Sequence, residues 1–119
     1  MRELVHVVIT VNSAWNVWNF RMPLVKKLLQ RGDRVTVFAP HDDCVDKLVE
    51  NGCNFRPLNI SNAGLNPLEL LLIGWQFRRM IKELRPSIVL GFTIKNNLVG
   101  ALLSKLYDVP FLPNITGLG

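Results

Sequence analysis

Glycine is missing where a dinucleotide-binding loop would need it. The first apolar segment, residues 4–11, runs into Asn-Ser-Ala-Trp-Asn-Val-Trp at 12–18 and not into a GxGxxG sequence. Only glycine lets the backbone close around a pyrophosphate at that turn. Asp42 and Asp43 follow the second apolar segment, where a ribose-binding acid would stand, but without the glycines we favour helix capping for them. The sequence therefore argues against a nicotinamide-dependent dehydrogenase.

Cysteine and histidine are scarce, with two of each. Cys44 and Cys53 are too far apart for a CxxC pair, so we expect ordinary reduced thiols and not a disulfide or a metal site. His6 lies inside an apolar segment and is expected to be a hydrogen-bonded core side chain, whereas His41 is expected in a surface loop. Neither a Ser/His/Asp triad nor a metal-ligand spacing is visible, so we expect no metal and no cofactor, and the catalytic residues stay unknown.

Long apolar runs are also missing. Residues 4–11 are too few for a signal-peptide core with its cleavage site or for a membrane span, which favours a cytoplasmic protein. Fourteen Lys and Arg against nine Asp and Glu give a net charge of +5, so an anionic partner such as a phosphate or a membrane surface is plausible. The positive residues are spread along the chain, and we do not expect nucleic acid as a partner.

What is present is an alternation of apolar and amphipathic segments, with enough apolar material, 49% of residues, for one domain with a real core. The nearly continuous β-branched run at 4–11 is typical of a strand buried on both faces of a parallel sheet. Right-handed crossovers then predict an α/β fold, a doubly wound, Rossmann-like parallel sheet in strand order 3-2-1-4-5 with helices on both faces. The expected strands cover residues 4–11, 34–39, 54–58, 87–91 and 109–112, and the expected helices about 20–31, 42–50, 67–84 and 96–107.

Two polar segments lie at the predicted carboxyl edge of the sheet. The loop expected at 12–18, with Phe20, sets aromatic rings beside short polar side chains, which suits a sugar. For Trp15 we favour a ligand contact, and for Trp18 and Phe20 packing at the start of the first helix. In the other segment, 91–97, a helix N-terminus with Thr93 and Lys95 suits a phosphate or carboxylate, although a solvated lysine and a capping Thr93 or Asn96 explain the same residues.

The helix expected at 67–84 has two apolar stripes. One is the natural core face, and the other passes into Arg79 and Lys82, an arrangement that suits an anionic bilayer surface. The alternative is that the second stripe packs under the loop at 59–66, a neighbouring helix or another subunit. The core stripe is Leu70, Ile73, Phe77, Met80, Ile81 and Leu84, and the second stripe is Leu68, Leu71, Leu72 and Trp75.

Several short motifs carry a family resemblance. They are Asn12-Ser13 to Asn19-Phe20-Arg21 with Pro23-Leu24, Arg31-Gly32, Asn66-Pro67-Leu68, Arg85-Pro86, Phe92-Thr93-Ile94-Lys95-x-Asn97 with Gly100, and Asn114-Ile115-Thr116-Gly117-Leu118-Gly119. Together they resemble the N-terminal domain of GT-B glycosyltransferases, in the family 4 group that builds bacterial surface polysaccharides on lipid carriers. The chain departs from that pattern at Asn96, where similar sequences often have proline, and at Gly91-Phe92, which offers no histidine or acid before Thr93.

The resemblance implies that residues 1–119 are one Rossmann-like domain, the acceptor-binding N-terminal half of a two-domain enzyme whose donor-binding domain lies outside this chain. The expected reaction is a metal-independent transfer of a sugar from a nucleotide-sugar to a polyprenyl-linked glycan acceptor, with retention of the anomeric configuration. It is expected at the inner face of the membrane. The chain alone is expected to be inactive. The alternative is a non-catalytic binding or membrane-recruiting subunit of a split glycosyltransferase.

The resemblance also implies a set of substrate-binding residues lining an interdomain cleft, with a C-terminal domain or a partner subunit on its other side. These residues are Asn12, Ser13, Trp15, Asn19, Arg21, Thr93, Lys95, Asn97, Asn114, Thr116 and Gly117.

Overall fold

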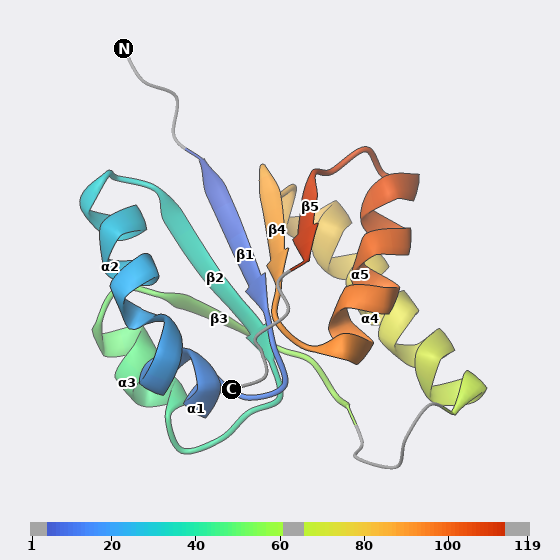
Figure 1. The fold of residues 1–119 in the computed structure, drawn as a ribbon, viewed down its shortest axis with the longest axis horizontal. Helices are drawn as coiled ribbons and strands as arrows, with labels where there is room; N and C mark the ends of the chain where they lie inside the picture. Colours follow the sequence, from blue (N-terminus) through green and yellow to red (C-terminus); the bar gives the residue numbers. More distant parts are fainter. Residues whose placement is uncertain (1–4, 61–65, 114–119) are drawn as a thin grey trace.

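A five-stranded, all-parallel sheet forms the centre of the protein in the computed structural model, which describes residues 5–60 and 66–113 and, for Ile94 and Lys95, the backbone only. The strand order is β3-β2-β1-β4-β5, which confirms the predicted 3-2-1-4-5 order (Figure 1). Val7 of the central strand pairs with Val35 on one side and with Ile88 on the other. The strands are β1 (His6–Thr10), β2 (Arg34–Ala39), β3 (Asn54–Pro57), β4 (Ile88–Gly91) and β5 (Phe111–Pro113).

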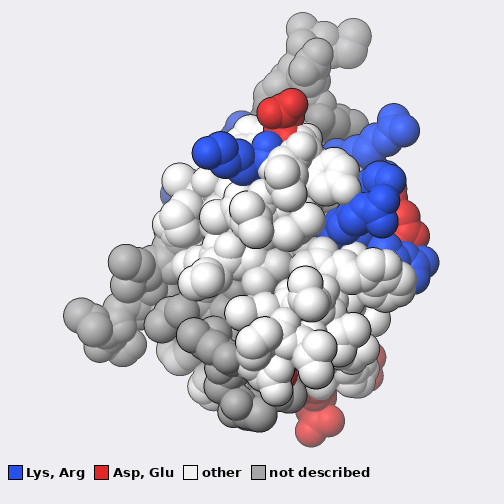
Figure 2. Space-filling view, turned by 90° about the vertical axis from the view of Figure 1, so that its right-hand side faces the viewer, with Lys and Arg blue, Asp and Glu red and all other residues white. Residues whose placement is uncertain are grey.

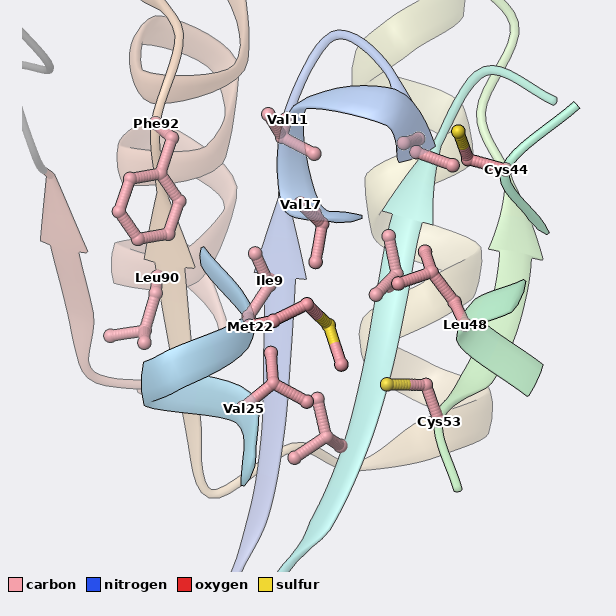
Figure 3. Packing of buried hydrophobic residues seen from close by; sticks show 14 of the residues in the cluster. Ile9, Val11, Val17, Met22, Val25, Cys44, Leu48, Cys53, Leu90 and Phe92 are labelled. Carbon is pink, nitrogen blue, oxygen red and sulfur yellow. The ribbon is translucent and has the colours of Figure 1, made fainter. Parts of the chain in front are cut away.

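Helices cover both faces of the sheet (Figure 1). One face packs against α1 (Ala14–Asn16), η1 (Val17–Arg21), α2 (Met22–Gln30) and α3 (Val45–Glu50), and the other against α4 (Pro67–Leu84) and α5 (Ile94–Leu106). Each face has its own hydrophobic core. Figure 3 shows the first of these, where Ile9 of β1 and Leu90 of β4 lie beside Met22 and Val25 of α2.

β1 is buried along its whole length, as its β-branched composition predicts. His6 is its one polar aromatic residue, and the expected hydrogen-bonded core role is confirmed. Its Nε2 lies 2.7 Å from the Thr36 hydroxyl oxygen and its Nδ1 lies 3.3 Å from the Leu84 carbonyl oxygen. Burial, followed by the positive charge of Arg34, lowers the pKa of His6, while the hydrogen bond to Leu84 acts in the opposite direction.

The loop predicted at 12–18 is wrong from Ala14 onward, because helical structure begins there. The Ser13 hydroxyl accepts a hydrogen bond from the Asn16 N–H at 3.1 Å, and the Asp42 carboxylate accepts one from the Trp15 N–H at 2.9 Å. A π-helical turn, η1, then joins α1 to α2. The turn leaves Trp18 partly buried, as favoured, but Phe20 is 58% exposed, so the core role favoured for Phe20 is also wrong.

α4 has the bounds that the sequence predicts. Pro67 occupies its first turn, the Asn66 side chain caps the Leu68 N–H at 2.9 Å, and Arg85 ends the helix in the left-handed region with φ 48°. The predicted core stripe is confirmed: its four central residues are buried and the two outer ones pack against them. The second stripe stays exposed, so its packing under another part of the described chain is ruled out.

The last helix and strand are displaced from their predicted positions. α5 starts at Ile94, two residues early, because Thr93 is extended and acts as its N-cap. β5 starts at Phe111, two residues later than predicted. Asp108 takes a positive φ of 56°, and the Val109 N–H is bound to the Ser104 carbonyl at 2.8 Å, so these residues close the helix before the strand can begin.

Candidate functional site

The candidate site lies at the carboxyl edge of the sheet, between β1 and β4. These two strands are neighbours, but the helices that follow them, α1–α2 and α5, cover opposite faces (Figure 1). Open α/β sheets bind their ligands at such a point, where the two following loops separate and leave a crevice. The two predicted polar segments, 12–21 and 92–97, flank this point, and the crevice between β1 and β4 is the name used below for this part of the carboxyl edge.

Asn96 joins the two sides of the crevice. Its side chain is fully buried, and its Nδ2 donates to the Thr10 hydroxyl at 2.6 Å and to the Val11 carbonyl at 3.1 Å. The first turn of α5 is thereby tied to the end of β1. The capping role considered for Asn96 is wrong, because the N-cap position belongs to Thr93, whose side chain makes no capping hydrogen bond.

Arg21 also spans the crevice. Its guanidinium carbon lies 4.3 Å from the centroid of the Phe92 ring, a cation–π contact between the end of η1 and the residue after β4. Phe92 is itself buried against the α2 side of the sheet (Figure 3). The sequence predicts a binding role for Arg21 and Thr93 but does not predict that the Phe92 ring would contact the guanidinium.

The remaining predicted residues of the first segment serve different purposes. Ser13 is used as the cap of α1, and Asn12 is exposed. Trp15 is 51% exposed and meets the Phe20 ring edge-on at 5.5 Å, while Asn19 donates to the Trp15 carbonyl at 2.9 Å. The helical turn therefore presents an outward aromatic pair, which can still stack on a sugar.

Asp42 connects two helix beginnings. One carboxylate oxygen accepts from the Cys44 N–H at 2.8 Å, just before α3, and the other accepts from the Trp15 N–H. Both oxygens are thus engaged with backbone donors, but the N-cap position of α3 is Cys44, which has no side-chain cap, so the predicted capping of that helix by Asp42 is wrong.

Three of the predicted substrate-binding residues, Asn114, Thr116 and Gly117, lie outside the described residues. Asn97 is half-buried in the first turns of α5, and for Lys95 only the backbone position in that turn is described. Within the described chain, no group of three His, Cys, Asp or Glu side chains could hold a metal ion. Cys44 and Cys53 are buried free thiols, and burial raises the pKa of Cys53 to about 11, which makes it a poor nucleophile.

A second surface feature lies on the opposite side of the sheet from α2. Figure 2 shows a broad uncharged face over α4 and α5, with Lys and Arg gathered at its upper and right margins. A groove of about 610 Å³ runs between the two helices, and Gly74, Trp75 and Leu102 are among the residues that line it. No helix in the described part of the chain is long and apolar enough to span a bilayer. The exposed apolar residues are Leu68, Leu71, Leu72 and Trp75 of α4 and Leu98, Leu102 and Leu106 of α5.

Comparison with known proteins identifies the family. A model of the glycosyl transferase 4-like family matches residues 6–119. The chain belongs to this family. A curated relative is the N,N'-diacetylbacillosaminyl-diphospho-undecaprenol alpha-1,3-N-acetylgalactosaminyltransferase of Campylobacter jejuni, 30% identical over 105 residues. That match covers 87% of this chain and 28% of the relative, so the glycosyl transferase 4-like chain spans less than a third of it.

Solved structures share the fold. A glycosyltransferase from Rickettsia africae superposes with a TM-score of 0.81 at 17% identity, covering 99% of this chain and 31% of that one. Acinetobacter baumannii MurG gives 0.69 at 22% identity, covering 92% and 33%. These likenesses confirm the Rossmann-like domain that the family resemblance implies.

Proposed function

We propose that this glycosyl transferase 4-like domain binds the acceptor in an enzyme that moves a sugar from a nucleotide-sugar to a lipid-linked glycan, with retention of the anomeric configuration. The observation that carries the proposal is that Arg21 and Phe92 bring the segments after β1 and β4 together at the carboxyl edge of the sheet, in a chain of the glycosyl transferase 4-like family. Support for the acceptor class comes from the Campylobacter jejuni relative, whose name specifies a diphospho-undecaprenol-linked acceptor.

Nucleotide-sugar binding and stabilisation of the departing nucleotide are assigned to a second domain, outside the 119-residue chain. The predicted residues of the crevice then face the acceptor, with the aromatic pair of Trp15 and Phe20 stacking on a sugar ring. Electrostatic stabilisation of the leaving group is usually the largest catalytic contribution, so the isolated chain is expected to transfer nothing.

The experiment compares the purified 119-residue chain with the protein encoded by the complete open reading frame. Each protein is given a mixture of nucleotide-sugars and a lipid-linked acceptor. Transfer by the longer protein alone is the expected result. Steady turnover by the short chain would contradict the division into acceptor and donor domains. A gene that stops after Gly119 would instead favour the subunit of a split glycosyltransferase, and adding the partner chain should then restore transfer.

We further propose that the face formed by α4 and α5 docks on an anionic bilayer at the cytoplasmic side of the membrane. Three exposed apolar residues of α4 lie at 62–71% exposure, and Trp75 at 52%. Contiguous apolar surface of this kind marks an interaction site on a soluble domain. Its margin is cationic, with Arg78, Arg79, Lys82, Arg85 and Lys105 all exposed, which matches the charge of acidic lipid headgroups (Figure 2).

Vesicle co-sedimentation tests the docking face with a matched pair of variants. Trp75 and Val49 are equally exposed, at 52%, but Val49 lies on α3, on the other face of the sheet. Trp75→Glu should lose binding to vesicles containing acidic lipid, Val49→Glu should keep it, and salt should weaken the binding of the wild-type chain. Equal loss in both variants, or no binding by the wild type, would rule out this face.

A further inference from the structure

Arg21 is a cation with no counter-charge among the described residues. It forms no ion pair with any described residue, whereas Arg31 pairs with Asp33 at 3.7 Å and Arg56 pairs with Glu83. The Nε of Arg21 is buried and has no hydrogen-bond partner in the described chain. Buried donors of this kind are normally satisfied, because leaving one unpaired costs about 1–3 kcal/mol.

The π-helical turn fixes where this arginine lies. η1 ends at Arg21, at the junction with α2, where the backbone takes φ −115° and ψ −2°. Its neighbour Phe20 is 58% exposed, yet Arg21 is half-buried with its guanidinium over the Phe92 ring. π-helical turns inserted between α-helical segments are frequently found at functional sites. Here the turn holds a cation over the crevice between β1 and β4.

The other side of the same crevice offers further unsatisfied groups. Phe92 directly precedes Thr93, the N-cap of α5, so the free N–H groups and positive dipole end of this 13-residue helix lie next to the arginine's stacking partner. The Thr93 hydroxyl is buried and has no partner among the described residues. The same is true of the Oδ1 of Asn96, whose side chain is 0% exposed. The hydroxyl can donate to an anion, and the amide oxygen can accept from a ligand hydroxyl.

We propose that Arg21 and the first turn of α5 bind a phosphoryl group of a sugar-bearing substrate. The guanidinium supplies two or more charge-assisted hydrogen bonds, for which its planar fork is suited, and the Phe92 ring holds it in place. The proposal rests on the proposed function only for the identity of the substrate, since both a lipid-linked acceptor and a nucleotide-sugar carry a diphosphate.

The test uses the 119-residue chain and inorganic pyrophosphate, followed by NMR of the arginine Nε–Hε resonances. The Arg21 signal is identified by its disappearance from the spectrum of Arg21→Gln, and it should move saturably in the wild type. Arg21→Gln should weaken pyrophosphate binding by about tenfold or more. The matched control is Arg79→Gln, which removes the same charge from an arginine that also lies over an aromatic ring, that of Trp75, at 5.0 Å. This variant should change the affinity for pyrophosphate less than about twofold.

An Arg21 signal that does not move at saturating pyrophosphate would overturn the site. Equal weakening of pyrophosphate binding in both variants would overturn it too, because it indicates general attraction to a positively charged protein. Repeating the titration with UDP and with geranyl diphosphate identifies the source. Tighter binding of either one supports the site and assigns it to the donor or to the acceptor. If the full-length enzyme transfers sugar equally well with Arg21→Gln, the site is refuted and the proposed function stands. If the chain binds pyrophosphate through Arg21 but the full-length protein transfers no sugar, the site stands and the proposed function is refuted.

Discussion

Gly74 and Gly100 occupy facing helices, and replacing each by alanine should have different effects on stability. A Cβ placed on Gly74 would lie 3.8 Å from the nearest atoms of Val99 and Leu103, which is ordinary van der Waals contact. A Cβ placed on Gly100 would lie 2.6 Å from the Phe111 ring and 3.1 Å from the Phe77 ring. Phe77 is fully buried and cannot move aside, whereas Phe111 lies on the edge strand β5.

The magnitudes follow from two contributions. Alanine is favoured over glycine inside a helix by about 1 kcal/mol, and both variants gain this. Overpacking a well-filled core costs about 1–3 kcal/mol, and only Gly100→Ala incurs it. We therefore expect the free energy of unfolding to rise by about 1 kcal/mol for Gly74→Ala and to change by between about zero and −2 kcal/mol for Gly100→Ala. The difference between the variants, about 1–3 kcal/mol, is the sharper quantity.

Urea unfolding followed by circular dichroism measures both variants, with unchanged m-values as the check that the unfolded state is comparable. Phe111→Leu in the Gly100→Ala background should recover part of the loss, because it removes the ring that the new methyl group meets. If Gly100→Ala is as stable as Gly74→Ala, the close approach of α5 to the Phe77 and Phe111 rings is not as described, and the argument from packing fails.

Three further changes test other parts of the structure. Asn96→Ala should lower the free energy of unfolding by about 1–3 kcal/mol, because it removes two buried hydrogen bonds, and a loss below about 0.5 kcal/mol in urea would contradict that role. Because the pKa of His6 is lowered in the folded state from the ordinary 6.5, the unfolded chain takes up the proton first, so stability should fall as the pH drops below about 6.5. Urea titrations at pH 7.5 and 5.5 should show a smaller fall for His6→Gln. In the full-length enzyme, Lys95→Ala should raise a Michaelis constant or lower turnover by roughly tenfold, about 1.4 kcal/mol, and unchanged kinetics would make Lys95 a solvated surface residue.

The strand order and α4 could be predicted because their signals are local. β1 is a continuous apolar run, and α4 has a proline in its first turn, a capping asparagine before it and a proline after its end. Such capping and stop residues act within a few residues of the helix or strand whose ends they set. The order of strands then follows from crossover handedness, which depends on topology and not on individual side chains.

The helical turn at 14–21 could not be predicted because a distant residue holds its start. Ser13 is a local N-cap signal, but the Trp15 N–H is bound by Asp42, 27 residues away. The segment has no amphipathic period, and η1 breaks the period of 3.6 that a helix search looks for. The role of Asn96 depends in the same way on Thr10, 86 residues earlier in the chain. Both are tertiary hydrogen bonds, which composition and spacing do not encode.

Trp75 borders two hollows on the surface of the domain. Its side chain lines the apolar groove between α4 and α5, and it also lines a more polar hollow of about 720 Å³ with Pro40 and Asn59. Those two residues follow β2 and β3, so the hollow opens at the carboxyl edge of the sheet, the same edge that holds the crevice between β1 and β4. A lipid-linked substrate has an apolar tail and a polar head, which need surfaces of opposite character within one molecular length. On this domain an apolar face with a cationic margin adjoins a hollow that offers the polar side chains of Asn59 and Gln76, and this adjacency supports the proposal that the domain binds a lipid-linked acceptor.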